Sequence, residues 1–138
     1  MLVVDMPPGT GDISISLGQL LPRAETVVVT TPQTLAREVA SRAAAMAQKT
    51  GLRLVGVVEN MSSEVFGSGG GDRLAVELGV PLLGRVPLDA ALRKSGDGGV
   101  PLVVSHPDSE SAQTILEIAR EIDASRVGGF TSTLPLVS

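Results

Sequence analysis

Short apolar runs alternate with longer segments of helical periodicity along most of this chain. Mainly apolar segments at residues 26–30, 52–59 and 82–86 are typical of strands, and a further apolar run ends at Val3-Val4. The stretch Val27-Val28-Val29 has no polar alternation, which predicts a strand that is buried on both faces. Because strands and helical segments alternate, the pattern predicts an α/β fold with a parallel sheet.

The longest helical segment is expected to begin at Thr31-Pro32, as N-cap and first helical residue, and to end at Gly51. Its apolar positions recur at helical spacing and share one face, which consists of Leu35, Val39, Ala43 and Met46. Further helices are expected at residues 13–21, at residues 72–78 and after a cap at Asp108.

The composition narrows the classes of function. The 138 residues carry 11 basic and 15 acidic side chains, a net charge of −4 without a cluster of Lys or Arg, which disfavours nucleic-acid and membrane-surface partners. The chain has no cysteine, so these residues offer neither disulfides nor thiolate metal ligands. No run of about eighteen apolar residues occurs, and we expect a cytoplasmic protein whose partners are other proteins and a small ligand.

The first twelve residues combine an apolar strand that ends in Asp5 with a turn rich in Pro and Gly, which runs to Asp12. This arrangement is typical of the Walker B strand of a nucleotide hydrolase, in which Asp5 would hold Mg²⁺, through water, beside the β- and γ-phosphates. Gly9 and Gly11 would let backbone N–H groups approach the γ-phosphate. Asp12 either orients the attacking water or caps the following helix, and Asp5 taken by itself is also compatible with a simple turn.

A phosphate-binding loop of the form G-x-x-x-x-G-K-[ST] does not occur in the 138 residues. The Gly-rich run at residues 67–71 is not followed by Lys-Ser or Lys-Thr, and we interpret it as a mobile hinge. The sequence therefore predicts a nucleotide-binding fold that is truncated at its N-terminus.

Seven short motifs follow one another along residues 2–123. They are Asp5–Asp12, Thr30–Gln33, Glu59–Ser62, Phe66–Gly71, Leu83–Asp89, Ser95–Asp97 and Pro107–Ser109. In this order they resemble the Mrp/ApbC family of iron–sulfur cluster carrier ATPases, which are deviant-Walker-A P-loop ATPases like MinD, ParA and the nitrogenase iron protein. The resemblance implies a parallel-sheet P-loop NTPase-like fold, bound ATP and Mg²⁺, and ATP-bridged homodimers.

The resemblance also assigns residues to the nucleotide base. Asn60 lies where the wider class hydrogen-bonds adenine, and its amide offers both a donor and an acceptor. Pro87, Leu88 and Asp89 resemble the second loop that flanks adenine. Without the family, Asn60 is a common turn former and Asp89 a helix N-cap. Residues 1–125 would be the C-terminal part of a P-loop ATPase domain, with Walker B, adenine loop and dimer-facing loop, and residues 126–138 a disordered tail.

Two departures from the family pattern bear on function. The half with the phosphate loop is missing, and where carriers place a C-P-x-C pair that holds a [4Fe–4S] cluster, only Ser63, Glu64 and Val65 remain. We expect part of an ATPase of iron–sulfur cluster assembly or transfer that is inactive alone and works with assembly or recipient proteins. The alternatives are part of a MinD/ParA-like partition ATPase and a non-catalytic partner module of a split ATPase.

Overall fold

Helices and strands alternate along the chain in the computed structural model, which describes residues 1–7, 12–21 and 23–125, without the side chains of residues 12–14. In chain order the elements are α1 (Asp12–Leu20), β1 (Glu25–Thr30), α2 (Thr34–Lys49), β2 (Arg53–Ser62), α3 (Gly70–Leu78), β3 (Leu82–Pro87), α4 (Ala90–Gly98), α5 (Leu102–Ser105) and α6 (Glu110–Ala124). The strands predicted at residues 26–30, 52–59 and 82–86 are confirmed, with β2 extending three residues further than expected.

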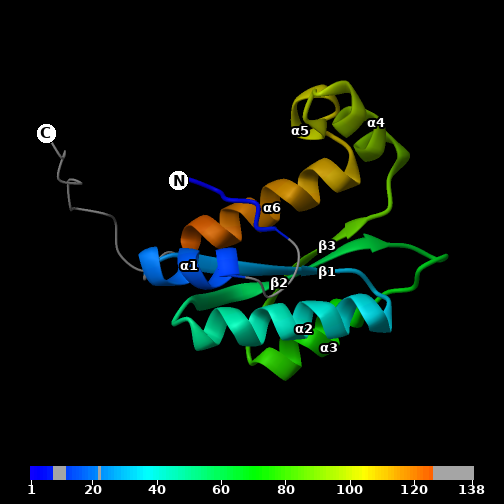
Figure 1. Cartoon of the computed structure of the whole chain (residues 1–138). Coiled ribbons are helices and arrows are strands. Elements are labelled where there is room, and N and C mark those ends of the chain that lie inside the picture. Colours follow the sequence, from blue (N-terminus) through cyan, green and yellow to red (C-terminus); the bar gives the residue numbers. More distant parts are fainter. Residues whose placement is uncertain (8–11, 22, 126–138) are drawn as a thin grey trace, which may run out of the picture.

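The strands form one parallel sheet in the order β1-β2-β3. Val29 pairs with Val58 across the first ladder, and Asn60 pairs with Val86 across the second. Because the strands are parallel, their carboxyl ends meet at one edge of the sheet, on the right in Figure 1. The predicted α/β fold is confirmed, and this edge is where the predicted base-binding residues lie.

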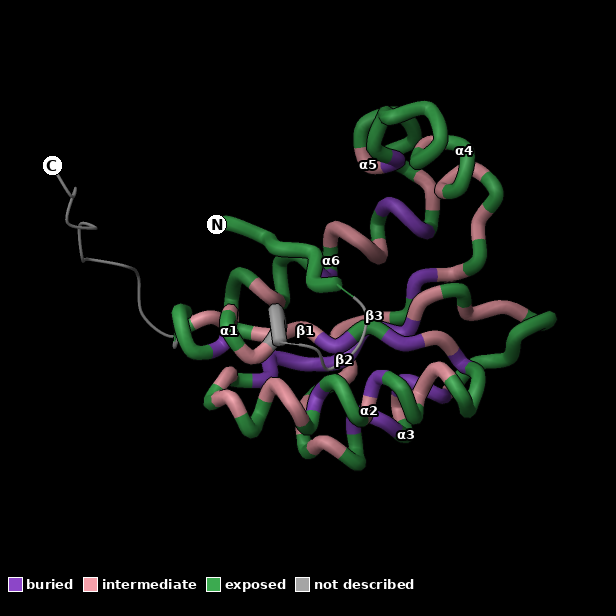
Figure 2. Tube along the Cα trace, viewed as in Figure 1, coloured by how far each residue is buried: buried purple, intermediate pink, exposed green. Residues whose placement is uncertain are grey.

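Helices cover both faces of the sheet, with α2 and α3 on one face and α6 on the other (Figure 1). The core beneath α2 and α3 contains Val28, Ala40, Ala44, Leu54, Val57, Leu74 and Ala75, and the core beneath α6 contains Val58, Val86 and Ile118. β2 lies between its two neighbours, and its six residues from Leu54 to Glu59 are all buried, as the continuous purple stretch in Figure 2 shows.

β1 lies at an edge of the sheet, because β2 is its one strand partner within the described part of the chain. Val29, in the run predicted to be buried on both faces, is 58 % exposed. The predicted strand that ends at Val3-Val4 is wrong for this structure, since residues 1–7 are exposed and have no regular secondary structure (Figure 2). A strand needs a neighbouring strand for its backbone groups, and none of the described strands pairs with this segment.

α2 packs on the sheet through small residues. Its buried positions are Ala40 and Ala44. The predicted apolar face is wrong as the core face, because Leu35 is 73 % exposed and Val39 is 53 % exposed. The helix carries two apolar stripes, and the alanine stripe allows the closer approach to the sheet, whereas the prediction chose the bulkier one.

Gly69, Gly70 and Gly71 of the Gly-rich run form the start of α3, so the interpretation as a mobile hinge is wrong for these three residues. Gly69 has φ +87°, and Gly70 and Gly71 are buried. A Cβ on Gly70 would lie 2.6 Å from the carbonyl oxygen of Pro32, and a Cβ on Gly71 would lie 2.7 Å from the Cβ of Glu59. The positions are glycine because α3 begins in close contact with the chain at the ends of β1 and β2.

α4 and α5 form a projection beyond the carboxyl end of β3 (Figure 1). No residue of α4 is buried, whereas Leu102 of α5 is buried where α5 packs against α6. Ser109, rather than the predicted Asp108, is the N-cap of α6, and Gln33, rather than Thr31, precedes α2. Within the described ranges, no helix is long and apolar enough to cross a membrane.

Candidate functional site at the carboxyl edge of the sheet

The carboxyl ends of β2 and β3 bring the two predicted base-binding segments together. Asn60 and Ser62 both pair with residues of β3 in the parallel ladder. The N–H of Leu88 donates to the carbonyl oxygen of Ser62 at 2.9 Å, which extends the contact beyond the end of β3. Asn60 and the segment Pro87–Asp89 are therefore neighbours.

One of the two polar groups of the Asn60 side chain is hydrogen-bonded within the protein. Its Oδ1 accepts a hydrogen bond from the N–H of Met61 at 2.8 Å, within an irregular stretch at the end of β2 in which Met61 has φ +61°. The amide NH₂ forms no hydrogen bond to any of the described residues. The structure thus places Asn60 in a strand and not in a turn, and its amide NH₂ is available as a donor.

Asp89 caps α4. Its Oδ1 accepts the N–H of Ala91 at 2.7 Å, and its Oδ2 accepts the hydroxyl of the buried Ser111 at 2.9 Å. The N–H of Ala91, followed by the Ser111 hydroxyl, holds the pKa of Asp89 below its usual value. The structure thus shows the capping role, and because both carboxylate oxygens are engaged, a contact with a base would fall to the backbone of this segment.

Glu59 ends the buried part of β2 and is itself fully buried, with 0 % of its surface exposed. Its carboxylate accepts hydrogen bonds from the N–H of Gly71 at 2.6 Å, the hydroxyl of Ser62 at 2.7 Å and the N–H of Gly69 at 3.1 Å. Burial by itself raises the pKa of Glu59, but these hydrogen bonds and the charge of Arg85 outweigh it and hold the pKa below its usual value. Glu59 is therefore ionised at neutral pH.

Arg85 of β3 balances this charge. Its Nε lies 3.8 Å from Oε1 of Glu59, and its guanidinium also pairs with Asp72 in the first turn of α3. The hydrogen bond from Arg85 lowers the pKa of Asp72, and the same bond raises the pKa of Arg85. One guanidinium and two carboxylates therefore join β2, β3 and α3 at one corner of the sheet.

Sequence reasoning missed Glu59 and Arg85 as members of the site. One signal was present, because Glu59 ends the apolar run at residues 52–59, and an acid in a buried strand requires hydrogen-bond partners. Those partners come from α3 and β3, and a single sequence does not show which segments meet there.

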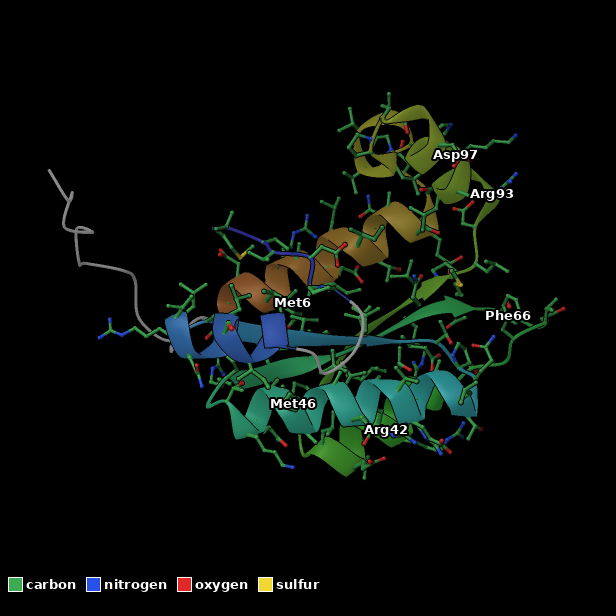
Figure 3. The ribbon with its side chains drawn as sticks, viewed as in Figure 1. Met6, Arg42, Met46, Phe66, Arg93 and Asp97 are labelled. Carbon is green, nitrogen blue, oxygen red and sulfur yellow. The ribbon has the colours of Figure 1, made fainter. Side chains whose placement is uncertain are left out.

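An open groove borders this corner. It is lined by Ser62, Ser63, Glu64, Gly67, Ser68, Arg85, Pro87 and Glu110. An antiparallel bridge between Ser63 and Gly67 makes residues 63–67 a small hairpin, and Phe66 lies at its projecting tip (Figure 3). The groove thus offers open space beside Pro87, one of the residues assigned to the base.

Of the residues predicted to bind phosphate, Asp5 is the one whose side chain lies within the described part of the chain. Asp5 lies in the exposed segment 1–7 and forms no hydrogen bond or ion pair with the described residues. Gly9 and Gly11 lie outside the described residues, and Asp12 is the first residue of α1, with its side chain outside that description. In the described ranges, no group of three or more His, Asp or Glu residues could hold a metal ion.

Residues 1–123 match the family model described as ParA, NUBPL iron-transfer P-loop NTPase. The chain belongs to this family. It is 50 % identical over 143 residues to the iron-sulfur cluster carrier protein of Mycobacterium tuberculosis, a match that covers 93 % of this chain and 38 % of the relative. It is 40 % identical over 131 residues to the iron-sulfur cluster transfer protein NUBPL of Mus musculus, with 88 % and 41 % covered. These relatives are consistent with the predicted Mrp/ApbC type, and the chain spans about two-fifths of their length.

The fold is similar to solved structures of MinD. The cell division ATPase MinD of Pyrococcus furiosus superposes with a TM-score of 0.65 at 27 % identity, over 72 % of this chain and 42 % of that chain. The septum site-determining protein MinD of Pyrococcus horikoshii, solved with Mg-ADP, gives a TM-score of 0.64 at 28 % identity, over 72 % and 41 %. The predicted P-loop NTPase-like fold is confirmed by these neighbours.

Proposed function

We propose that this chain supplies the Walker B and adenine-binding part of an ATPase of iron–sulfur cluster transfer. Asn60 donates its amide NH₂ to adenine, and Pro87–Asp89 flank the base. Toward the phosphates the proposed residues are Asp5 for Mg²⁺ through water, Gly9 and Gly11 for the γ-phosphate, and Asp12 for the attacking water. Bound Mg²⁺ would neutralise charge on the β- and γ-phosphates.

The observation that supports this proposal is the juxtaposition at the carboxyl edge. Asn60 keeps an amide donor that no described residue uses, and it lies next to the end of β3, where Leu88 is bonded to Ser62. Nucleotides bind at the carboxyl ends of strands in open parallel sheets. A single carboxylate such as Asp5 is compatible with Mg²⁺, because this ion keeps several waters and takes other ligands from phosphate.

An iron–sulfur cluster would be cargo of the whole assembly, and the residues of this chain do not fit it. The 138 residues include no cysteine, and [4Fe–4S] clusters are held by cysteine thiolates. We therefore propose that the chain serves cluster assembly or transfer through ATP, as a homodimer in the cytoplasm that meets assembly or recipient proteins. The 50 % identity to a carrier, against 27 % to MinD, favours this role over a partition ATPase.

The experiment measures ATP hydrolysis by a complete ATPase that is reconstituted from two parts. This chain is co-expressed with the part of the Mycobacterium tuberculosis relative that lies outside the match, and Mg²⁺-dependent phosphate release is measured. We expect hydrolysis from the pair and none from this chain alone, loss of hydrolysis in Asp5→Ala, and full hydrolysis in the exposed control Glu121→Ala. Hydrolysis at the parent rate by Asp5→Ala would contradict the Mg²⁺ assignment, and turnover by the chain alone would contradict its role as one part of the site.

A further inference from the structure

The motif Glu59–Ser62 contributes more to this edge than the amide of Asn60. We propose that Glu59 is the positioning residue of the edge, because its buried carboxylate fixes Asn60, the segment Pro87–Asp89 and the first turn of α3 relative to one another. The consequence for nucleotide binding rests on the proposed function, whereas the arrangement itself is independent of it.

The carboxylate of Glu59 accepts two hydrogen bonds from the start of α3. The N–H of Gly71 donates to Oε2 at 2.6 Å, and the N–H of Gly69 donates to Oε1 at 3.1 Å. The first N–H groups of a helix have no partner within the helix, and they favour a negative charge. Because Glu59 is fully buried, its removal would leave these groups without an acceptor in an interior site.

The same carboxylate also holds the irregular end of β2 that carries Asn60. The hydroxyl of Ser62 donates to Oε1 of Glu59 at 2.7 Å and so joins the two ends of the four-residue motif. Between them Met61, where the register of the ladder shifts, has φ +61°, and its N–H donates to Oδ1 of Asn60. A residue other than glycine keeps a left-handed conformation only where its surroundings hold it. The direction of the Asn60 amide NH₂ therefore depends on the bond between Glu59 and Ser62.

Ser62 also bonds to the segment that follows β3. Its carbonyl oxygen accepts the N–H of Leu88 at 2.9 Å. The next residue, Asp89, caps α4 and accepts the hydroxyl of Ser111 from α6. A series of hydrogen bonds thus runs from Glu59 through Ser62 to the segment that would flank the base, and one carboxylate serves both predicted base-binding segments.

The experiment compares ligand-free NMR spectra of the full ¹⁵N-labelled chain and its variant Glu59→Gln. Loss of the charge should shift the backbone amides of Gly69 and Gly71 and, with them, the side-chain NH₂ of Asn60 and the backbone amide of Leu88. The matched control is Glu64→Gln, an exposed glutamate of the 63–67 hairpin that forms no hydrogen bond with the described residues, and it should leave all four signals in place.

A second variant, Ser62→Ala, removes the bond between Ser62 and Glu59 and keeps both bonds from Gly69 and Gly71. We expect it to shift Asn60 and Leu88 while Gly71 stays unchanged. If Asn60 and Leu88 stay unchanged in both variants, Glu59 serves α3 alone and the proposal is overturned. If Glu59→Gln does not fold, Ser62→Ala decides by the same criterion.

Titration with Mg-ATP separates this proposal from the proposed function. We expect Glu59→Gln and Ser62→Ala to weaken the ATP-dependent shift of the Asn60 side chain about fivefold, and Glu59→Asp to recover part of the loss. No response of Asn60 to ATP in the parent chain would contradict the proposed function, and the ligand-free comparison would still decide the positioning role. An equal ATP affinity in the parent chain and both variants would contradict the positioning of Asn60 by Glu59.

Discussion

The substitution Gly71→Ala tests the packing of α3 against the end of β2. A Cβ at this position would lie 2.7 Å from the Cβ of Glu59 and 3.0 Å from Cδ1 of Leu82, so at least one backbone segment has to shift. Overpacking of this kind costs about 1–3 kcal/mol, and weakening the buried hydrogen bond from Gly71 to the carboxylate adds about 1 kcal/mol or more. The better helix propensity of alanine returns at most about 1 kcal/mol. We expect a net loss of about 2–3 kcal/mol in the free energy of unfolding.

The assay is urea unfolding at low protein concentration, followed by circular dichroism. With an m-value of about 1–3 kcal/mol per molar urea, the loss should lower the midpoint by about 1 M or more. The matched control is Gly96→Ala in α4, where a Cβ would meet no atom within 4 Å, and which should be neutral or slightly stabilising. A free energy of unfolding for Gly71→Ala within about 0.5 kcal/mol of the parent chain would refute the packing argument.

Three further predictions concern pH, association and iron. Hydrogen bonds lower the pKa of Glu59 below its usual value, so the stability that Glu59 contributes is fully present above that value and is lost as the pH falls through the folded-state pKa. The urea midpoint should therefore fall on acidification, and it should fall less in Glu59→Gln. The open edge of β1 should promote association, and light scattering should show less of it for Val29→Lys than for the control Val104→Lys on α5, both at exposed positions. Anaerobic incubation with iron and sulfide should give no stable [4Fe–4S] absorbance, since the chain has no cysteine, and a cluster that survives desalting would contradict this.

The strands of the sheet could be predicted from the sequence, because each strand is marked by its own local pattern of apolar residues. The apolar runs at 26–30, 52–59 and 82–86 fix the strands, and the helical segments between them require parallel connections. The family resemblance assigned Asn60 and Pro87–Asp89 to one base, and the structure places both segments at carboxyl ends of neighbouring strands. The prediction of the strands and of the α/β fold needed the period of the pattern and the order of the elements, and both can be read from one sequence.

The errors arose where the outcome depends on which segments meet. The face of α2 was misassigned because Ala40 and Leu35 lie on different apolar stripes, and only the distance to the sheet favours the alanine. The Gly-rich run looked mobile by composition, although Gly71 is glycine because Glu59 occupies the space of a side chain. Glu59 itself was overlooked because the two backbone groups that bind its carboxylate lie 10 and 12 residues away along the chain, at the start of α3.

The central claim is that the carboxyl edge of β2 and β3 receives the adenine of ATP. The measurement that tests it most directly is a titration of the ¹⁵N-labelled chain with Mg-ATP, compared with Mg-GTP, followed at the side-chain NH₂ of Asn60 and the backbone amide of Leu88. We predict saturable shifts at both groups with a dissociation constant of about 1 mM or weaker, because phosphate-loop contacts are not among these residues, and a smaller response to GTP. An absence of shifts at both groups up to about 10 mM ATP, or shifts confined to other parts of the surface, would contradict the account.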